Sequence, residues 1–246
     1  MEEEKSVVEE KYGDRSKELS INLQIVKNTT KEKLQNIFQS NYDFVHYIGH
    51  CTREGLGCVD GYLSCSTPDI CQIKTFFLNA CGSFEQGRKL IDRGSVGGVV
   101  TRNRVLNREA TRIGSTFANL VIHGFDIEQS LKIASKKSIT NHEYFVIGDG
   151  TYRLTQGDDP DPSIIKINPI GNDTFHVTDD NNSIRGIGIC KQTDLSNEDK
   201  YMLVGNSTTV EMARKDLIDN IKNINEPIIF NGTYYWSDDL RIKLQN

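Results

Sequence analysis

The feature that most constrains the fold is a pair of short apolar segments, each of which ends at a reactive side chain. Residues 43–50 (DFVHYIGH) end at His50, and residues 75–83 (TFFLNACGS) carry Cys81. Both contain aromatic or β-branched residues and no proline, which predicts two buried strands. Carboxyl ends of neighbouring parallel strands meet at the crevice where open α/β sheets bind ligands. The sequence therefore predicts that His50 and Cys81 lie together at one edge of a sheet.

An imidazole and a thiol at such an edge are sufficient for nucleophilic attack on a carbonyl group. Gly82 and Ser83 follow Cys81 and predict a turn that exposes the sulfur at the start of a helix, whose positive end favours the thiolate. His46 precedes His50 by four positions, on the same face of the strand but deeper in the domain, so we interpret it as structural. The competing interpretations are a buried, inert cysteine and a hydrogen-bonded histidine at a strand end.

The surrounding elements predict the fold class. Alternating residues at 21–26 indicate a first strand, and a helix over 31–39 connects it to the strand that ends at His50, which makes a βαβ unit. Further strands are expected at 75–80, 96–101 and 144–150, and further helices at 84–92, 108–123 and 126–137. This order predicts a three-layer α/β/α sandwich with a mostly parallel sheet over residues 1–154.

A second domain is predicted over residues 155–246. Composition changes at 156–162 (QGDDPDP), which is typical of an exposed connection. Short strands are expected near 164–167, 174–178, 184–190 and 201–204, followed by a helix over 210–223. Asn231-Gly232 lies between two apolar runs and predicts a hairpin with a type I′ turn. These elements indicate a small α+β domain, in which we find no catalytic motif.

Charge and hydropathy limit the classes of partner. The 246 residues include 29 basic and 34 acidic side chains, a net charge of −5 at pH 7. This balance argues against general binding to nucleic acid or to anionic membranes. The sequence shows no secretory signal and no apolar run of about 18 residues, so a cytoplasmic location is expected. The expected partner is a protein or peptide substrate, with room for a regulatory protein partner.

The cysteines fit a reducing compartment. The chain has six, which is below the density of a disulfide scaffold. Four of them lie between the two key strands: Cys51, Cys58, Cys65 and Cys71. Their gaps lack the C-x-x-C spacing of structural zinc sites, although a metal site that uses His46 or His50 with these thiols is an alternative. We expect reduced thiols, no metal and no cofactor.

The two key segments resemble those of a known family. His46–His50 (HYIGH) together with Leu78–Ser83 (LNACGS) is similar to the CHAT domain, a branch of the caspase–separase clan of cysteine peptidases. The resemblance spans about residues 20–154. It includes Gly94–Val100 (GSVGGVV) and the paired helices over 108–137.

This resemblance implies a caspase-like fold and a cysteine endopeptidase with a His–Cys dyad. His50 would be the general base and acid, and Cys81 the nucleophile that forms a thioester acyl-enzyme. The backbone N–H groups of Cys51 and Cys81 would form the oxyanion hole. The residue after the histidine is commonly glycine in the clan, so Cys51 adds bulk beside the scissile carbonyl.

Two substrate preferences follow from charged residues near the key segments. Asp60, on the glycine-rich connection after His50, could select lysine or arginine, although a turn residue is the simpler interpretation. Arg102 and Arg104 could instead recognise an acidic side chain. Together with Arg108 and Arg112 they also fit a solvated approach to a helix.

Two other classes of function compete with the peptidase. One is a catalytically inactive interaction module that keeps the caspase-like fold. The other is a flavodoxin-like domain that binds an anion in the same crevice. That domain needs a glycine-rich loop after the first strand, and Lys27–Thr30 (KNTT) does not provide one.

Overall fold

The protein is described from a computed structural model, which divides the chain into two compact units, Met1–Gln156 and Gly157–Asn246. The structure describes residues 2–16, 19, 21–67, 69–136, 138, 140–154, 162–181, 190–193, 195, 201–203, 205–222, 224 and 226–245. No helix among these residues combines the length and apolar character that crossing a membrane requires.

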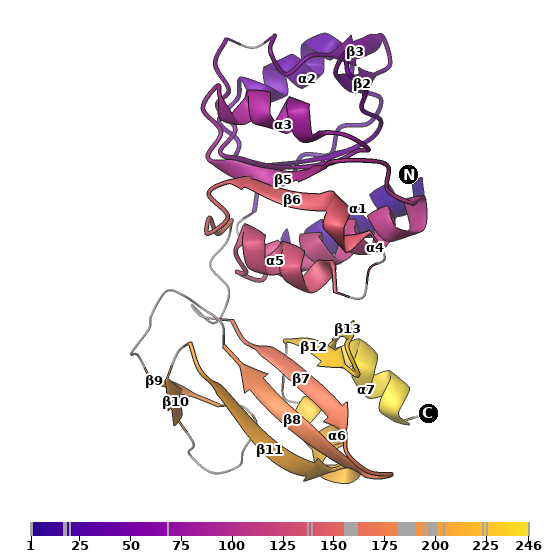
Figure 1. The fold of residues 1–246 in the computed structure, drawn as a ribbon, viewed down its shortest axis with the longest axis vertical. Helices are drawn as coiled ribbons and strands as arrows, with labels where there is room; N and C mark the ends of the chain where they lie inside the picture. Colours follow the sequence, from indigo (N-terminus) through magenta and orange to yellow (C-terminus); the bar gives the residue numbers. More distant parts are fainter. Residues whose placement is uncertain are drawn as a thin grey trace. The chain divides into compact units, whose positions relative to one another are not determined.

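The first unit is organised by a four-stranded sheet with the order β1-β4-β5-β6 (Figure 1). Its strands are β1 (Phe44–Ile48), β4 (Thr75–Asn79), β5 (Gly97–Thr101) and β6 (Tyr144–Gly148). The first three run parallel, and β6 is antiparallel to β5. Every residue of the central strands β4 and β5 is buried, as expected for strands covered on both faces. The prediction of a mostly parallel sheet is confirmed.

Helices cover both faces of this sheet (Figure 1). They are α2 (Lys31–Phe38) and α3 (Phe84–Ile91) on one side, and α1 (Glu2–Ser16), α4 (Asn107–Val121) and α5 (Ile127–Ala134) on the other. Side chains of β4 alternate between the two interfaces: Phe76 and Leu78 join the cluster under α2 and α3, whereas Phe77 packs with α4 and α5. The first unit is therefore the predicted three-layer α/β/α sandwich.

The connection between β1 and β4 folds into a small hairpin. Its strands are β2 (Leu56–Cys58) and β3 (Gly61–Leu63). Gln86, which is buried on α3, accepts a hydrogen bond from the backbone N–H of Cys65 at 3.0 Å. This bond ties the end of the hairpin to the helix that follows Cys81.

The prediction of a strand at 21–26 is wrong, because the structure shows an extended segment there that pairs with no strand. The apolar residues of this segment instead contact the core individually, as Leu23 does. The predicted helix over 126–137 ends earlier, at Ala134.

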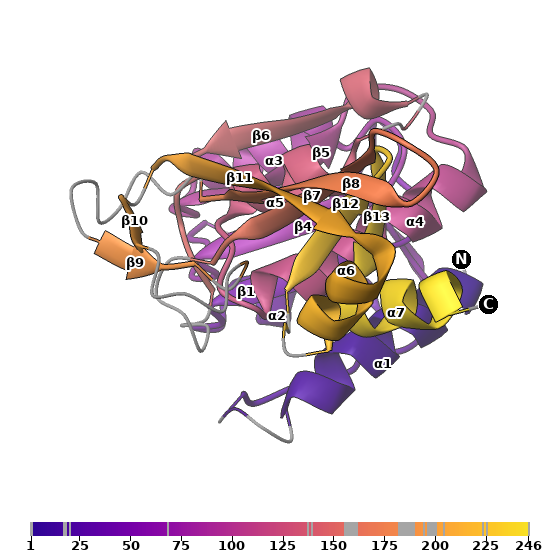
Figure 2. The same ribbon diagram turned by 90° about the horizontal axis from the view of Figure 1, so that it is seen from below.

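The second unit is an α+β domain built on a five-stranded sheet with the order β11-β8-β7-β12-β13. Its strands are β7 (Ile164–Pro169), β8 (Thr174–Asp180), β11 (Ser207–Ala213), β12 (Pro227–Phe230) and β13 (Thr233–Trp236). Helices α6 (Arg214–Ile221) and α7 (Ser237–Gln245) pack on one face of this sheet, as Figures 1 and 2 show. A separate pair, β9 (Cys190–Gln192) and β10 (Tyr201–Leu203), completes the described strands.

The hairpin prediction in this unit is confirmed and the helix prediction is partly wrong. Asn231 and Gly232 both have positive φ, 45° and 73°, as a type I′ turn requires. The predicted helix over 210–223 begins only at Arg214, because Ser207–Ala213 pairs with β8 instead. Most of the strand predicted over 184–190 lies outside the described residues.

Candidate active site

The structure brings the backbones of His50 and Cys81 to the same edge of the sheet. Strands β1 and β4 pair in parallel with partners 31 positions apart, from Phe44 with Thr75 to Ile48 with Asn79. His50 and Cys81 have the same spacing, two residues beyond the last pair, and both side chains are exposed. The segments stay adjacent past this point, because Sγ of Cys51 lies 3.8 Å from the carbonyl oxygen of Gly82.

The two reactive groups are not hydrogen-bonded to each other within the described part of the chain. Sγ of Cys81 accepts a hydrogen bond from the backbone N–H of Val105 at 3.4 Å and lies 3.8 Å from the Val105 carbonyl oxygen. Val105 belongs to the loop between β5 and α4. A working dyad therefore requires the sulfur to leave Val105 and the imidazole to turn toward it, as apo enzymes often require.

Two glycines explain why the chain can present these residues. A Cβ atom on Gly49 would lie 2.5 Å from the hydroxyl oxygen of Tyr47, so only glycine fits directly before His50. Gly82 has φ +69°, in the left-handed region that glycine adopts without strain, and it turns the chain out of β4. Helix α3 then begins at Phe84, which places Cys81 shortly before its N-terminus.

The two backbone N–H groups predicted to form the oxyanion hole have no hydrogen-bond acceptor among the described residues. Cys51 forms an isolated antiparallel bridge with Leu56, which uses the N–H groups of Thr52 and Gly57 and leaves the N–H of Cys51 free. The N–H of Cys81 likewise has no acceptor among the described residues. An oxyanion hole needs backbone donors of this kind, with no acceptor of their own, near the reacting atom.

A shallow, open hollow of about 630 Å³ marks the site. Its lining consists of Cys51, Cys81, Gly82, Asn103 and Arg104. Burial, and then the neighbouring thiol of Cys81, raises the pKa of Cys51 to about 11, so Cys51 is a neutral thiol at pH 7. Arg104 is exposed, and no ion pair engages its guanidinium within the described residues. The hollow therefore has the exposed thiol of Cys81 and the guanidinium of Arg104 in one lining.

The two residues predicted to bind substrate lie outside this lining. Oδ1 of Asp60 accepts the backbone N–H of Lys31 at 2.9 Å, which is a capping contact at the start of α2. The guanidinium carbon of Arg102 lies 4.4 Å from the centre of the Phe145 ring. The contacts of Asp60 with Lys31 and of Arg102 with Phe145 are structural, and a role in substrate binding for either residue stays a prediction. Of the two arginines that the sequence analysis named together, Arg102 and Arg104, only Arg104 is in the lining of the hollow.

His46 has the structural role that its position in the strand suggests. It stacks on Phe77 with ring centroids 4.8 Å apart, and its Nδ1 lies 3.1 Å from the hydroxyl of Tyr12. Burial lowers the pKa of His46 to about 3, so the imidazole is neutral at physiological pH. His46 packs against Phe77 and Tyr12 within the strand, so it does not reach the edge of the sheet where His50 lies.

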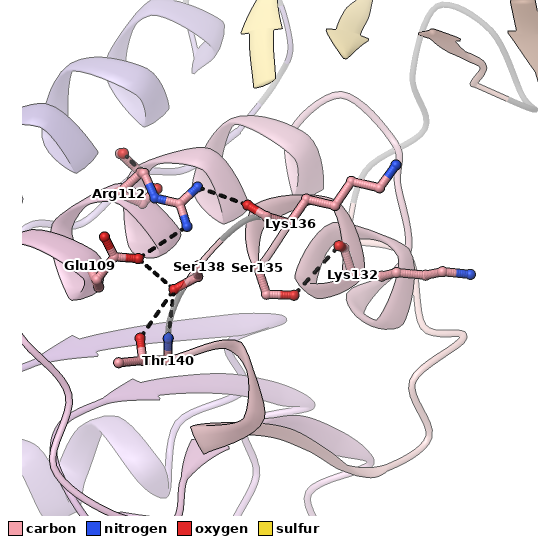
Figure 3. A network of polar contacts seen from close by, with 8 residues as sticks. Glu109, Arg112, Lys132, Ser135, Lys136, Ser138 and Thr140 are labelled. Carbon is pink, nitrogen blue, oxygen red and sulfur yellow. Dashed lines mark hydrogen bonds and ion pairs between the residues drawn. The ribbon is translucent and has the colours of Figure 1, made fainter. Parts of the chain in front are cut away.

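A polar network holds helix α4, which follows the loop that lines the hollow (Figure 3). Oε2 of Glu109 accepts hydrogen bonds from Ser138 Oγ at 2.5 Å and from Arg112 at 3.2 Å. Arg112 also donates to the carbonyl oxygen of Lys136 at 3.3 Å. The hydrogen bond from Ser138, followed by Arg112, lowers the pKa of Glu109. The network joins the start of α4 to the segment after α5.

The described residues contain no group of three or more His, Cys, Asp or Glu side chains placed to hold a metal ion. All six cysteines are free thiols. His50 does not belong to the lining of the hollow, although it lies at the same edge of the sheet as Cys81.

Comparisons with known proteins give a distant likeness in structure. No family model matches the chain, and no curated protein matches it. One similar solved structure is a complex of Porphyromonas gingivalis RgpB pro- and mature domains, with 14% identity and a TM-score of 0.41 over 64% of this chain and 45% of that one. Another is the Arg specific cysteine proteinase gingipain R (RgpB), with 15% identity and a TM-score of 0.42 over 64% of this chain and 44% of that one.

The chain thus spans less than half the length of those structures. Membership of the CHAT family stays a prediction, because no family model matches.

Proposed function

We propose that the first unit is a cysteine endopeptidase whose nucleophile is Cys81 and whose general base and acid is His50. The observation that carries this proposal is the register of β1 and β4, which delivers both residues to one edge beside two unpaired N–H groups. Strand-end residues at such an edge are where α/β folds carry out their chemistry.

The reaction proceeds in two stages. His50 takes the proton of the Cys81 thiol, and the thiolate attacks the carbonyl carbon of the scissile peptide bond. The N–H groups of Cys51 and Cys81 stabilise the oxyanion, and losing one such donor costs about 3 kcal/mol in the barrier. The C–N bond then breaks as His50 protonates the leaving amine, which leaves a thioester on Cys81. Water, deprotonated by His50, hydrolyses the thioester and regenerates the thiol.

Selective alkylation tests the proposed dyad. Iodoacetamide at pH 6–7 is expected to label Cys81 before the other thiols, and His50→Ala is expected to remove that preference, because the imidazole no longer generates the thiolate. Cys190 is the internal control, since it is also an exposed free thiol. Equal labelling of Cys81 and Cys190 in the wild type would contradict an activated nucleophile.

A catalytically inactive interaction module is the second candidate function. The observation that favours it is the contact of Cys81 with Val105, which occupies the sulfur in place of the imidazole. This candidate gains support if a peptide library shows no cleavage by the wild-type protein while Cys81 stays unreactive.

Arg104 sets the expected substrate preference. Its free positive charge at the hollow favours an acidic side chain near the scissile bond and disfavours a basic one. Because exposed charge pairs are worth up to about 1 kcal/mol, Arg104→Glu is expected to lower kcat/KM for acidic peptides about threefold to fivefold. A peptide-library cleavage assay at low and high salt measures this, and salt should weaken the preference.

Arg102→Glu is the matched control for this prediction, because Arg102 packs over Phe145 and lies outside the hollow. If Arg102→Glu changes the preference for acidic peptides and Arg104→Glu does not, Arg102 would be the residue that recognises the substrate. If the wild type instead prefers lysine or arginine and Asp60→Asn removes that preference, substrate recognition would be assigned to Asp60.

A further inference from the structure

A buried tyrosine contacts the backbone of His50, one of the two proposed catalytic residues. Tyr47, on β1, is 7% exposed and packs in the core on the α2 and α3 side of the sheet. Its hydroxyl oxygen lies 2.9 Å from the carbonyl oxygen of His50 and 2.9 Å from that of Gly57. The hydroxyl can donate its one proton to either carbonyl. Tyr47 therefore links the end of β1 to the hairpin that follows it.

Two donors face the carbonyl of His50. The backbone N–H of Gly57 donates to it at 2.8 Å, and the Tyr47 hydroxyl shares its one proton between this carbonyl and that of Gly57. The peptide group between Cys51 and Thr52 is held as well, because the N–H of Thr52 donates to the carbonyl of Gly55 at 2.9 Å. The direction of the His50 carbonyl is thus fixed by contacts on the hairpin side.

This direction determines where a proposed oxyanion donor faces. The carbonyl of His50 and the N–H of Cys51 belong to one planar trans peptide group, so they face opposite ways. When the carbonyl is held toward the hairpin, the Cys51 N–H faces away from it, and it has no acceptor among the described residues. A carbonyl that accepts hydrogen bonds also polarises its peptide group, which strengthens the N–H as a donor.

We propose that Tyr47 is a positioning residue of the oxyanion hole, acting through the peptide group between His50 and Cys51. The inference rests on the proposed peptidase function and deepens it. Gly49 is part of the same arrangement, because a Cβ atom there would lie 2.5 Å from the Tyr47 hydroxyl and displace it. Tyr47 is buried, and both partners of its hydroxyl are backbone carbonyls, so we expect its effect to be limited to the step that develops the oxyanion.

Tyr47→Phe is the test, because it keeps the buried ring and removes only the hydroxyl. Complete loss of an oxyanion donor lowers kcat by about 10²–10³-fold, so loosening one is expected to lower kcat about tenfold with KM unchanged. A peptide aldehyde, whose carbonyl becomes an oxyanion when Cys81 adds to it, should bind about tenfold more weakly. Alkylation of Cys81 by iodoacetamide develops no oxyanion in the hole and should keep its wild-type rate.

Tyr12→Phe is the matched control. It removes another buried hydroxyl, the one that lies 3.1 Å from Nδ1 of His46, and it leaves the peptide after His50 untouched. Its kcat and its aldehyde affinity are expected to equal those of the wild type, and thermal unfolding compares the stability of both variants.

The outcomes separate this inference from the proposed function. Wild-type turnover with an unchanged kcat and aldehyde affinity in Tyr47→Phe overturns the inference and leaves the peptidase intact. An equal fall in kcat and in the alkylation rate also overturns it, because Tyr47 would then act on the thiolate. If the wild type cleaves no peptide, both the inference about Tyr47 and the proposed peptidase function are overturned.

A measurement on the wild type covers the case in which Tyr47→Phe does not fold. On binding of the aldehyde, the Cys51 amide proton is expected to move downfield in the NMR spectrum as it bonds the oxyanion. The Gly57 amide, already bonded to the His50 carbonyl, is expected to move little. A Cys51 amide that stays in place overturns the inference.

Discussion

Replacing Cys81 with alanine is expected to abolish peptide hydrolysis and to leave the fold intact. Removing the nucleophile of a catalytic unit lowers kcat by about 10³-fold or more, and removing its base has a similar cost. His50→Ala should therefore be as inactive as Cys81→Ala, and the double variant no worse than either. Both side chains are exposed at the edge of the sheet, so thermal unfolding should change little.

The assay is cleavage of a peptide library by the wild type and these variants. Cys190→Ala is the matched control, because it removes an exposed thiol from the second unit and should retain full activity. Retained turnover in Cys81→Ala would remove Cys81 from the mechanism. Full activity in His50→Ala would assign the base to another group.

The sequence alone predicted the parts of the fold that local patterns determine. The strands around Val45 and Phe77 are apolar runs, and they form β1 and β4. Helix α2 begins where expected because the Thr30 side chain accepts the backbone N–H of Lys33. The two strand-end residues, His50 and Cys81, could also be singled out from the residues that surround them.

Features that depend on distant pairing were missed or misassigned. Glu211, Met212 and Ala213 favour helix, yet they form the end of β11 because β8 pairs along the whole strand. The contacts of Tyr47 and the position of Arg104 depend on where the β2–β3 hairpin and the loop after β5 fold back, and no local pattern specifies this. The cap at Asp60 depends on the same hairpin, since it joins residues 29 positions apart.

The stability of the first unit is expected to depend on pH through two buried groups with opposite effects. Glu4, on α1, contacts the side-chain amide of Asn79, and burial raises the pKa of Glu4 from 4.5 to about 7 against the opposing effects of that contact and Lys5. The folded state therefore favours the protonated acid. Its contribution is complete below pH 4.5 and is lost as the pH rises through 7, a change of up to about 3 kcal/mol.

His46 acts in the opposite direction. Burial lowers its pKa from 6.5 to about 3, so the folded state favours the neutral imidazole. Its contribution is complete above pH 6.5 and is lost as the pH falls toward 3, by up to about 1.4 kcal/mol per pH unit. Between pH 4.5 and 6.5 the two slopes oppose each other, and the contribution of this pair to the free energy of unfolding is nearly constant.

Glu4→Gln is expected to remove one of these slopes while it keeps an amide oxygen for Asn79. The variant should be about 2–3 kcal/mol more stable than the wild type at pH 8, where the wild type must bury a carboxylate. Between pH 6.5 and 4.5 its stability should fall by about 1 kcal/mol per pH unit, because the effect of His46 is no longer offset. Urea unfolding at a series of pH values, followed by circular dichroism, measures this.

Two controls make the pH experiment specific to the first unit. Glu10→Gln changes an exposed glutamate on the same helix and should reproduce the wild-type pH profile. The single tryptophan, Trp236, lies in the second unit, so its fluorescence follows that unit separately and should not respond to Glu4→Gln. Identical pH profiles for Glu4→Gln and the wild type would mean that the pKa of Glu4 is not raised in the folded protein. The contact between Glu4 and Asn79 would then be solvated, in place of the buried contact that the structure shows.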